Sequence, residues 1–171
     1  MIHIYSGEGK GKTTAAVGMA VRAAGAGLRV CFYQFLKNGS SSEISVLKSL
    51  KGVTVRCCRN CNKFTKDMNE EEKAAVTAEQ NSMLIEIKNI IKSENADVII
   101  MDEFIGAYNK ELIDCFFAEV MLKEFPSSME LIMTGREPSS FLCRIADYHS
   151  EINELKHPFQ KGIKSRRGIE Y

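Results

Sequence analysis

The sequence has no tryptophan, only three prolines and no apolar run of the roughly 18 residues that a membrane-spanning helix needs. The N-terminal segment lacks the basic start of a signal peptide, and glycines interrupt it early. The chain is also nearly neutral, with a formal net charge of +1, so no strong field draws it to nucleic acid or an anionic membrane. We therefore expect a cytoplasmic protein that binds neither nucleic acid nor a membrane.

The chain has enough apolar residues for a buried core. It has 171 residues, of which 44% are hydrophobic and 26% are charged, which is ordinary for a globular protein. It shows no internal repeat, low-complexity tract or linker, so we expect a single domain over residues 1–171. The six cysteines are expected to be free thiols, because the cytoplasm is reducing.

Apolar segments of two kinds alternate along the chain. Short β-branched or aromatic runs predict strands over residues 2–5, 28–36, 53–57, 97–103 and 129–135. Helical spacing predicts helices over residues 13–25, 70–93, 109–123 and 138–146, with a loop at 37–43 and irregular structure at 58–69. In the longest helix the expected core contacts are Ala75, Ala78, Met83, Leu84, Ile87, Ile90 and Ile91. Because several strands are apolar on both faces, the prediction is an α/β fold with a mostly parallel sheet and helices on both faces.

The segment SGEGKGKTT, residues 6–14, lies between the first predicted strand and the first predicted helix. Glycines let backbone N–H groups crowd around an anion, and a helix N-terminus adds partial positive charge. Lys12 can then reach phosphate oxygens, and Thr13 can supply a hydroxyl to Mg²⁺. The match to G-x-x-x-x-G-K-[ST] is imperfect, because Ser6 stands at the leading position. The alternative is a flexible glycine turn.

Two acids, Asp102 and Glu103, close the apolar segment DVIIMDE. Ligands of open α/β sheets bind at the carboxyl ends of strands, where an acid can hold Mg²⁺ directly or through water. The alternative is a solvated acidic pair.

Several segments together resemble the P-loop ATP:corrinoid adenosyltransferases. They are GEGKGKTTAAVGMAVRAAGAGLRV, YQFLK, IIMDE, LIMTGREPSSFLCRIAD and KHPFQKGIKSRRGIEY, in this order and over nearly the whole chain. The resemblance implies a RecA-like fold, a homodimer, and transfer of the 5′-deoxyadenosyl group of ATP to the cobalt of a reduced corrinoid. It also implies Mg²⁺, release of triphosphate, and a flavoprotein as a possible electron donor.

The resemblance also implies roles for particular residues. Those for ATP and its phosphates are Ser6, Gly7, Glu8, Gly9, Lys10, Gly11, Lys12, Thr13, Thr14 and Arg136. Those for the metal are Thr13, Asp102 and Glu103, and the catalytic set is Lys12, Thr13 and Glu103. Those for the corrinoid are Phe64, Thr65 and Glu43. For four residues a role outside ligand binding and catalysis stays open. Arg136 would then be a surface cation, Glu43 a solvated charge, Phe64 an anchor of its loop in the core, and His157 a structural histidine.

The sequence departs from the family at two places. Lys66 stands where the family often has tryptophan after Phe-Thr, and the leading segment of some members is absent. The corrinoid half of the site is therefore less well defined than the ATP half, and non-catalytic ligand binding is one rival function. The other rival is a P-loop kinase or ATPase.

Two further clusters have open interpretations. Cys58 and Cys61 form one C-x-x-C next to Cys57, which allows free thiols, a redox pair or a zinc site shared between subunits. Lys164, Arg166 and Arg167 form a small basic group, either a solvated surface or a contact to acidic corrinoid side chains.

Overall fold

A computed structural model describes residues 1–169 and shows one parallel sheet. Its strands are β1 (Ile2–Ser6), β2 (Val30–Gln34), β3 (Val53–Cys57), β4 (Val98–Asp102), β5 (Glu130–Thr134) and β6 (Tyr148–Glu151). They lie in the order β3-β2-β4-β5-β1-β6, and every neighbouring pair is parallel. The predicted α/β class with a parallel sheet is thus confirmed.

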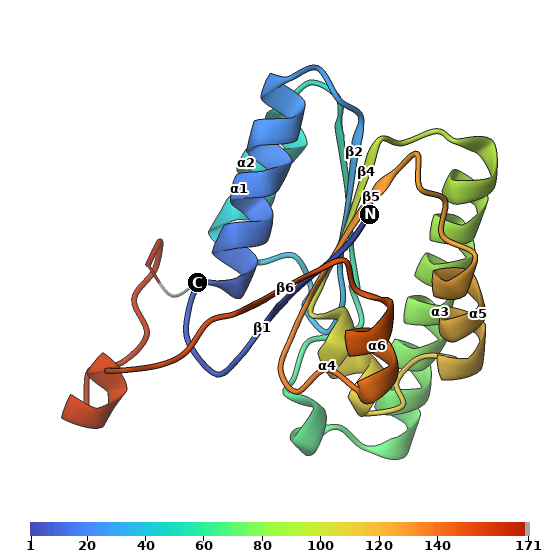
Figure 1. Ribbon diagram of the computed structural model, residues 1–171. Coiled ribbons are helices and arrows are strands. Elements are labelled where there is room, and N and C mark those ends of the chain that lie inside the picture. Colours follow the sequence, from blue (N-terminus) through green and yellow to red (C-terminus); the bar gives the residue numbers. More distant parts are fainter. Residues whose placement is uncertain (170–171) are drawn as a thin grey trace.

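Helices cover both faces of the sheet (Figure 1). They are α1 (Lys12–Gly25), α2 (Ser42–Ser49), α3 (Glu70–Ser93), α4 (Phe104–Asn109), α5 (Cys115–Lys123) and α6 (Ser140–Ile145), with 3₁₀ turns at Thr65–Asp67 and Pro158–Lys161. Helices α1 and α2 lie on one face, and α3 and α5 lie on the other. Parallel strands need such covering because both of their faces are apolar.

Alternate residues of the central strands enter two separate cores. Val98 and Ile100 of β4 pack with Ala16 and Ala20 of α1 in the first core. Ile99 and Met101 of β4 pack with Met83 of α3 in the second. This period of two explains why the segment is continuously apolar in sequence.

The helix predicted over 109–123 is partly wrong, because α5 covers only Cys115–Lys123, α4 already ends at Asn109, and residues 110–114 between them are not helical. Glu111 has a positive φ of 53°, which interrupts the helical path. Asp114 then starts α5, since its side chain accepts a hydrogen bond from the backbone N–H of Phe117.

The core face predicted for α3 is partly wrong. Ala75 and Ala78 are exposed, and Val76 and Gln80 are buried instead. Gln80 is tolerated there because its amide donates to the carbonyl of Leu112 and accepts from the N–H of Leu36. The predicted contacts Met83, Leu84 and Ile87 are buried, and Ile90 and Ile91 pack partly buried against them.

Two elements, α2 and β6, have no counterpart in the predicted set, and α4 shares only its last residue with a predicted helix. All four residues of β6 are exposed, so its sequence YHSE carries no apolar pattern. Its backbone nevertheless pairs with β1, with Tyr5 opposite Ser150 and Ser6 opposite Glu151. This pairing brings Ile152 and Asn153 against the glycine-rich loop.

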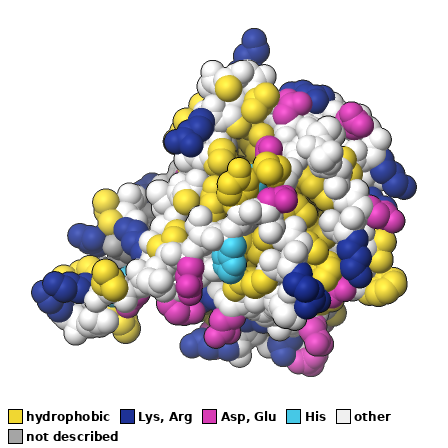
Figure 2. Space-filling view, in the orientation of Figure 1, with side chains coloured by type: hydrophobic (Ala, Val, Ile, Leu, Met, Phe, Trp, Pro, Cys, Tyr) yellow, Lys and Arg dark blue, Asp and Glu magenta, His cyan; other side chains and the backbone are white. Residues whose placement is uncertain are grey.

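The N-terminal ends of the strands border a largely apolar hollow of about 380 Å³, which Met1, Met19, Leu28 and Tyr148 help to line. Figure 2 shows hydrophobic side chains gathered near the middle of one face of the molecule, with charged side chains around them. Among residues 1–169, no helix has the length and apolar character needed to cross a membrane.

Candidate functional site

The glycine-rich loop joins β1 to α1, and it is shaped by the chain that follows β6. A Cβ at Gly7 would clash with the carbonyl oxygen of Ile152, and one at Gly9 would lie 2.7 Å from the same atom. The N–H of Gly9 donates to that oxygen at 2.8 Å. Gly11 begins α1 with a φ of 121°, and no other described residue would lie within 4 Å of a Cβ there. The loop is therefore backed by the chain just after β6 and open at the helix start.

Lys12 lies over this loop. Its Nζ donates to the carbonyl oxygens of Gly7 at 2.6 Å and of Gly9 at 2.9 Å. Burial lowers the pKa of Lys12, with a smaller contribution from Arg136, while the carboxylates of Glu103 and Glu8 oppose the shift. The loop carbonyls thus hold an ammonium group where a phosphate is expected to bind.

Asp102, fully buried at the end of β4, collects four donors. Its Oδ1 accepts from the hydroxyls of Thr13 at 2.9 Å and Thr134 at 2.7 Å. Its Oδ2 accepts from the amide of Gln34 and the ammonium of Lys37, both at 3.2 Å. A buried carboxylate requires such partners, because an unpaired one would pay a large desolvation cost. The alternative of a solvated acidic pair is wrong for Asp102.

Lys37 links the members of this cluster. Its Nζ also lies 3.2 Å from Oγ1 of Thr13 and 3.5 Å from Oε1 of Glu103. Burial alone would lower the pKa of Lys37, but Asp102 and Glu103 together hold that pKa above its ordinary value. The ammonium therefore stays charged at neutral pH. Glu103 has a positive φ of 59°, and its N–H donates to Oγ1 of Thr134 at 2.9 Å.

The predicted magnesium residues have donors that suit the ion. Thr13, Asp102 and Glu103 offer hydroxyl and carboxylate oxygens, which are the donors that Mg²⁺ prefers. The ammonium of Lys37 already contacts an oxygen of each, so this group of atoms attracts a cation. Residues 1–169 contain no group of three or more His, Cys, Asp or Glu side chains arranged to hold a metal. Phosphate and water oxygens would have to complete the coordination.

A cavity of about 480 Å³ opens above the loop. Residues 8–14 line it together with Lys37, Glu103, Arg136, Glu154, His157, Phe159, Gln160, Ser165 and Ile169. Arg136 contributes from the chain after β5 and forms an ion pair of 2.9 Å with Glu8. Nδ1 of His157 accepts from the N–H of Phe159 at 3.1 Å, which gives that histidine a structural contact at the cavity wall. Glycines, cations and a hydroxyl thus converge on one cavity.

The residues predicted for the corrinoid do not lie together. Glu43 lies in the first turn of α2 and lines a smaller cavity of about 330 Å³ with Thr13, Thr14 and Lys37. Phe64 is 78% exposed, so the alternative that it anchors its loop in the core is wrong. Thr65 is half-buried at the start of a 3₁₀ turn, and Lys66 follows it, exposed.

The structure has all six cysteines as free thiols. Cys58 and Cys61 are buried side by side, with their sulfur atoms 3.0 Å apart. The pKa of the Cys58 thiol is raised by its contact with Cys61 and by burial. The Cys58 thiol also donates to Oε2 of Glu79 at 3.5 Å, but the described residues contain no group of three or more such side chains arranged to hold a metal, so the zinc interpretation gains no support. Of the tail motif, Glu170 and Tyr171 lie outside the described residues.

Three site residues have no place in the predicted set: Gln34, Lys37 and Thr134. Each stands at or just after the carboxyl end of a strand, and two are polar residues inside otherwise apolar runs. A polar residue at the end of an apolar strand was thus the feature of the sequence that could have identified Gln34 and Thr134 as site residues. No described residue provides a hydrogen bond to Oε1 of Gln34, which is buried.

Comparison with known proteins agrees with this geometry. The family model described as ATP:corrinoid adenosyltransferase BtuR/CobO/CobP matches residues 1–171. A corrinoid adenosyltransferase of Escherichia coli K12 is 30% identical over 171 residues, which cover 100% of this chain and 85% of that protein. The corrinoid adenosyltransferase CobA of Salmonella typhimurium is 31% identical over 177 residues, covering 100% and 85%. A third relative, from Sinorhizobium, is 28% identical and covers 100% and 80%. The chain therefore belongs to the ATP:corrinoid adenosyltransferase BtuR/CobO/CobP family.

Proposed function

We propose that this protein transfers the 5′-deoxyadenosyl group of ATP to the Co(I) centre of a corrinoid and releases triphosphate. The observation that carries the proposal is the glycine loop of a chain in this family, with Lys12 over the loop and Thr13 hydrogen-bonded to the buried Asp102. A kinase or an ATPase would use a similar loop, but the family favours adenosyl transfer.

The reaction needs little chemistry from side chains. The electron pair of Co(I) attacks C5′ of the ribose, a Co–C bond forms, and the C5′–O bond breaks. Triphosphate leaves with the electron pair of that bond. No proton moves at the reacting atoms, so the loop's contribution is to hold and neutralise the leaving group. The ammonium of Lys12 and the open helix start at Gly11 face the cavity in which the phosphates would bind.

We further propose that Thr13, Asp102 and Glu103 hold Mg²⁺, directly or through water. The ion would supply positive charge that offsets the negative charge of the phosphates. The support is the set of oxygens already grouped around the ammonium of Lys37.

For the corrinoid, we propose Phe64 and Thr65 as contacts, with Glu43 nearer to the nucleotide. An exposed aromatic ring can pack on the face of a planar macrocycle, and Phe64 is available for this. Lys66 has no ring, so Phe64 alone would supply the aromatic contact. A homodimer, a flavoprotein electron donor and a cytoplasmic location stay predictions.

An anaerobic assay tests the reaction. It would combine the protein with ATP, Mg²⁺ and chemically reduced cobalamin, cobinamide or cobyrinic acid a,c-diamide, and follow the corrinoid spectrum and the phosphate product. We expect an adenosylated corrinoid with triphosphate. Release of ADP would instead indicate a kinase or an ATPase, and ATP binding without transfer would indicate a non-catalytic binding protein.

A further inference from the structure

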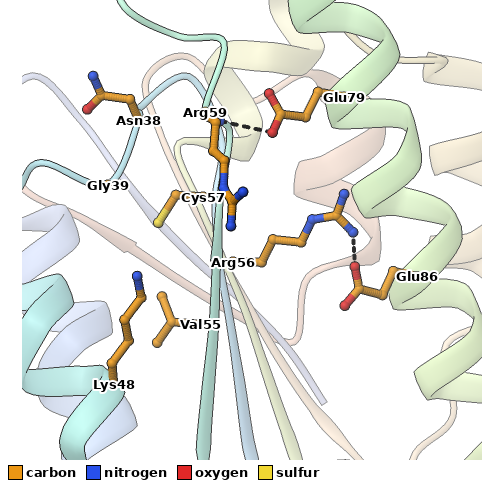
Figure 3. A pocket seen from close by; sticks show the side chains of 9 residues that line it. All are labelled: Asn38, Gly39, Lys48, Val55, Arg56, Cys57, Arg59, Glu79 and Glu86. Carbon is orange, nitrogen blue, oxygen red and sulfur yellow. Dashed lines mark hydrogen bonds and ion pairs between the residues drawn. The ribbon is translucent and has the colours of Figure 1, made fainter.

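A cavity of about 500 Å³ lies at the carboxyl ends of β2 and β3, apart from the nucleotide cavity (Figure 3). The segment after β2 separates the two, because Lys37 lines the nucleotide cavity and Asn38 and Gly39 line this one. Its other walls come from α2, from β3 and the residues after it, and from α3. The predicted functions assign nothing to this cavity.

Both acids of the cavity are already engaged. Glu86 forms an ion pair with Arg56, whose guanidinium also donates to Oγ of Ser82 at 2.7 Å. Glu79 accepts hydrogen bonds from the backbone N–H groups of Arg59 at 3.0 Å and Asn60 at 2.9 Å. Burial would raise the pKa of Glu79, but these two N–H groups hold it below its ordinary value. Both carboxylates therefore already have partners within the cavity.

Two cations remain, Lys48 of α2 and Arg59 of the segment after β3. Residues 1–169 offer neither charged end a hydrogen bond or an ion pair. Figure 3 shows the two charged ends pointing from different elements toward the region around Cys57. Burial raises the pKa of the Cys57 thiol, and the positive charges of Lys48 and Arg59 both oppose that rise. Both cations therefore act on one place in the cavity.

We propose that Lys48 and Arg59 bind an anionic peripheral group of the corrinoid, either a carboxylate or a phosphodiester. This inference rests on the proposed function. Two like charges held in one concave space repel each other, and an anion between them removes that repulsion and gains charge-assisted hydrogen bonds.

The position of Arg59 connects the cavity with the corrinoid contacts. Arg59 lies on the same irregular segment as Phe64 and Thr65, which we propose to contact the macrocycle. Asn38 at the cavity wall donates to Oδ1 of Asn62 on that segment at 3.1 Å. A macrocycle packed on this segment would bring its charged side chains, which project from its periphery, within reach of the two cations.

The test compares three acceptors that differ in anionic groups. Cobyrinic acid a,c-diamide carries peripheral carboxylates, cobalamin carries one phosphodiester, and cobinamide carries neither. The variants are Lys48→Ala and Arg59→Ala, with Arg59→Gln as a milder change. Lys51→Ala is the matched control, because it removes an exposed lysine outside the cavity. The readouts are KM and kcat under anaerobic conditions, and equilibrium dialysis of the Co(II) form of each corrinoid.

We expect each cavity variant to raise KM and the dialysis Kd for at least one anionic corrinoid by about tenfold, the worth of one charge-assisted hydrogen bond. The value of kcat and the constants for cobinamide should not change. A rise confined to cobyrinic acid a,c-diamide identifies a carboxylate as the ligand, and a rise confined to cobalamin identifies the phosphodiester.

Equal losses with cobinamide, or no loss with any corrinoid, would overturn the proposal. If the unmodified protein transfers to none of the three acceptors, the proposed function fails. The dialysis then still decides the anion site, which is overturned if the cavity variants bind every corrinoid as the control does.

Discussion

Asp102, at the end of β4, brings together residues from the carboxyl ends of three other strands. Its carboxylate accepts hydrogen bonds from four side chains: Thr13 after β1, Gln34 at the end of β2, Lys37 after β2, and Thr134 at the end of β5. A carboxylate with this many donors is held in one orientation. The hydroxyl of Thr134 makes two hydrogen bonds: it donates to the carboxylate of Asp102 and accepts from the backbone N–H of Glu103. The geometry of the predicted metal residues thus depends on a buried threonine that does not itself line the cavity.

Replacing Thr134 with valine tests that dependence. Thr134→Val keeps the shape but leaves the buried Asp102 and the N–H of Glu103 each short of one partner, so the free energy of unfolding should fall by about 1–3 kcal/mol. Urea unfolding would measure it. Thr77→Val, at a half-buried position of α3 where no described residue is hydrogen-bonded to the hydroxyl, serves as the control. Equal stability of the two variants would show that the Thr134 hydroxyl holds nothing in place.

Lys12 is the residue whose loss should affect turnover most. Lys12→Ala removes the ammonium from the loop carbonyls of Gly7 and Gly9, and with it a positive charge at the leaving phosphates. Turnover should fall by about 10²–10³-fold, the usual cost of one group that stabilises developing charge. Anaerobic turnover and a thermal melt would be compared with Lys51→Ala. An unchanged turnover number would refute the role of Lys12 in phosphate binding.

At the scale of elements, β6 supports the glycine loop although its own side chains are exposed. Gly9→Ala should cost about 1–3 kcal/mol of stability, because its Cβ would lie 2.7 Å from the carbonyl of Ile152 and push β6 away from the loop. Gly18→Ala is the matched control. Gly18 lies exposed in α1 with no described residue within 4 Å of the added Cβ, so it should stabilise the protein by about 0.5–1 kcal/mol.

Denaturant unfolding of the two glycine variants gives the comparison directly. Faster hydrogen exchange in residues 148–153 of Gly9→Ala would locate the damage at β6. Opposite signs for the two variants are the expected result. A Gly9→Ala protein as stable as Gly18→Ala would mean that β6 does not constrain the loop.

The start of β2 is tied to the start of β4 by one ion pair. The guanidinium of Arg29 donates to the carboxylate of Asp97, and the backbone N–H of Arg29 donates to the same carboxylate at 2.7 Å. These bonds lower the pKa of Asp97 to about 2. A carboxyl group whose pKa is lower in the folded than in the unfolded chain stabilises the fold above its unfolded pKa, about 3.9, and that contribution is lost as the pH falls toward about 2.

Asp97→Asn should therefore lower the melting temperature at pH 7, and the difference from the unmodified protein should shrink below about pH 4. Melting curves across pH 2–8 would measure it. Asp67→Asn, an exposed residue at the end of a 3₁₀ turn, provides the comparison. A difference that stayed constant to the lowest pH would contradict the ion-pair account.

At the scale of the whole molecule, the loop after β1 and the acid Asp102 at the end of β4 lie at the carboxyl ends of their parallel strands. The strand order places β5 between these two strands. A ligand that bridges them should stabilise the fold as a unit. Mg²⁺ and ATP at about 100 times the Kd should add about 2.7 kcal/mol to the free energy of unfolding. Differential scanning calorimetry would measure this gain. Lys12→Ala should gain much less at the same concentrations, and an equal gain would place the nucleotide elsewhere.

Local features of the chain were predictable from the sequence alone. The strands of the sheet interior follow from apolar β-branched runs, and α1 and α3 follow from helical spacing. The segment of residues 6–14 predicts a phosphate site because the required residue types follow one another in the chain, and the acid at position 102 supports that prediction. The roles of these residues, the single domain and the magnesium ion stay predictions.

What only the tertiary structure decided depends on contacts between distant segments. Lys37 and Thr134 reach Asp102 because β2, β4 and β5 are neighbours in the sheet, and nothing local in the sequence specifies that order. The strand β6 forms by backbone pairing with β1, which leaves no side-chain pattern to recognise. The cations Lys48 and Arg59 share a cavity for the same reason. The sequence by itself determined which chemistry is present at each strand end, and the order of the strands decided which of these ends meet.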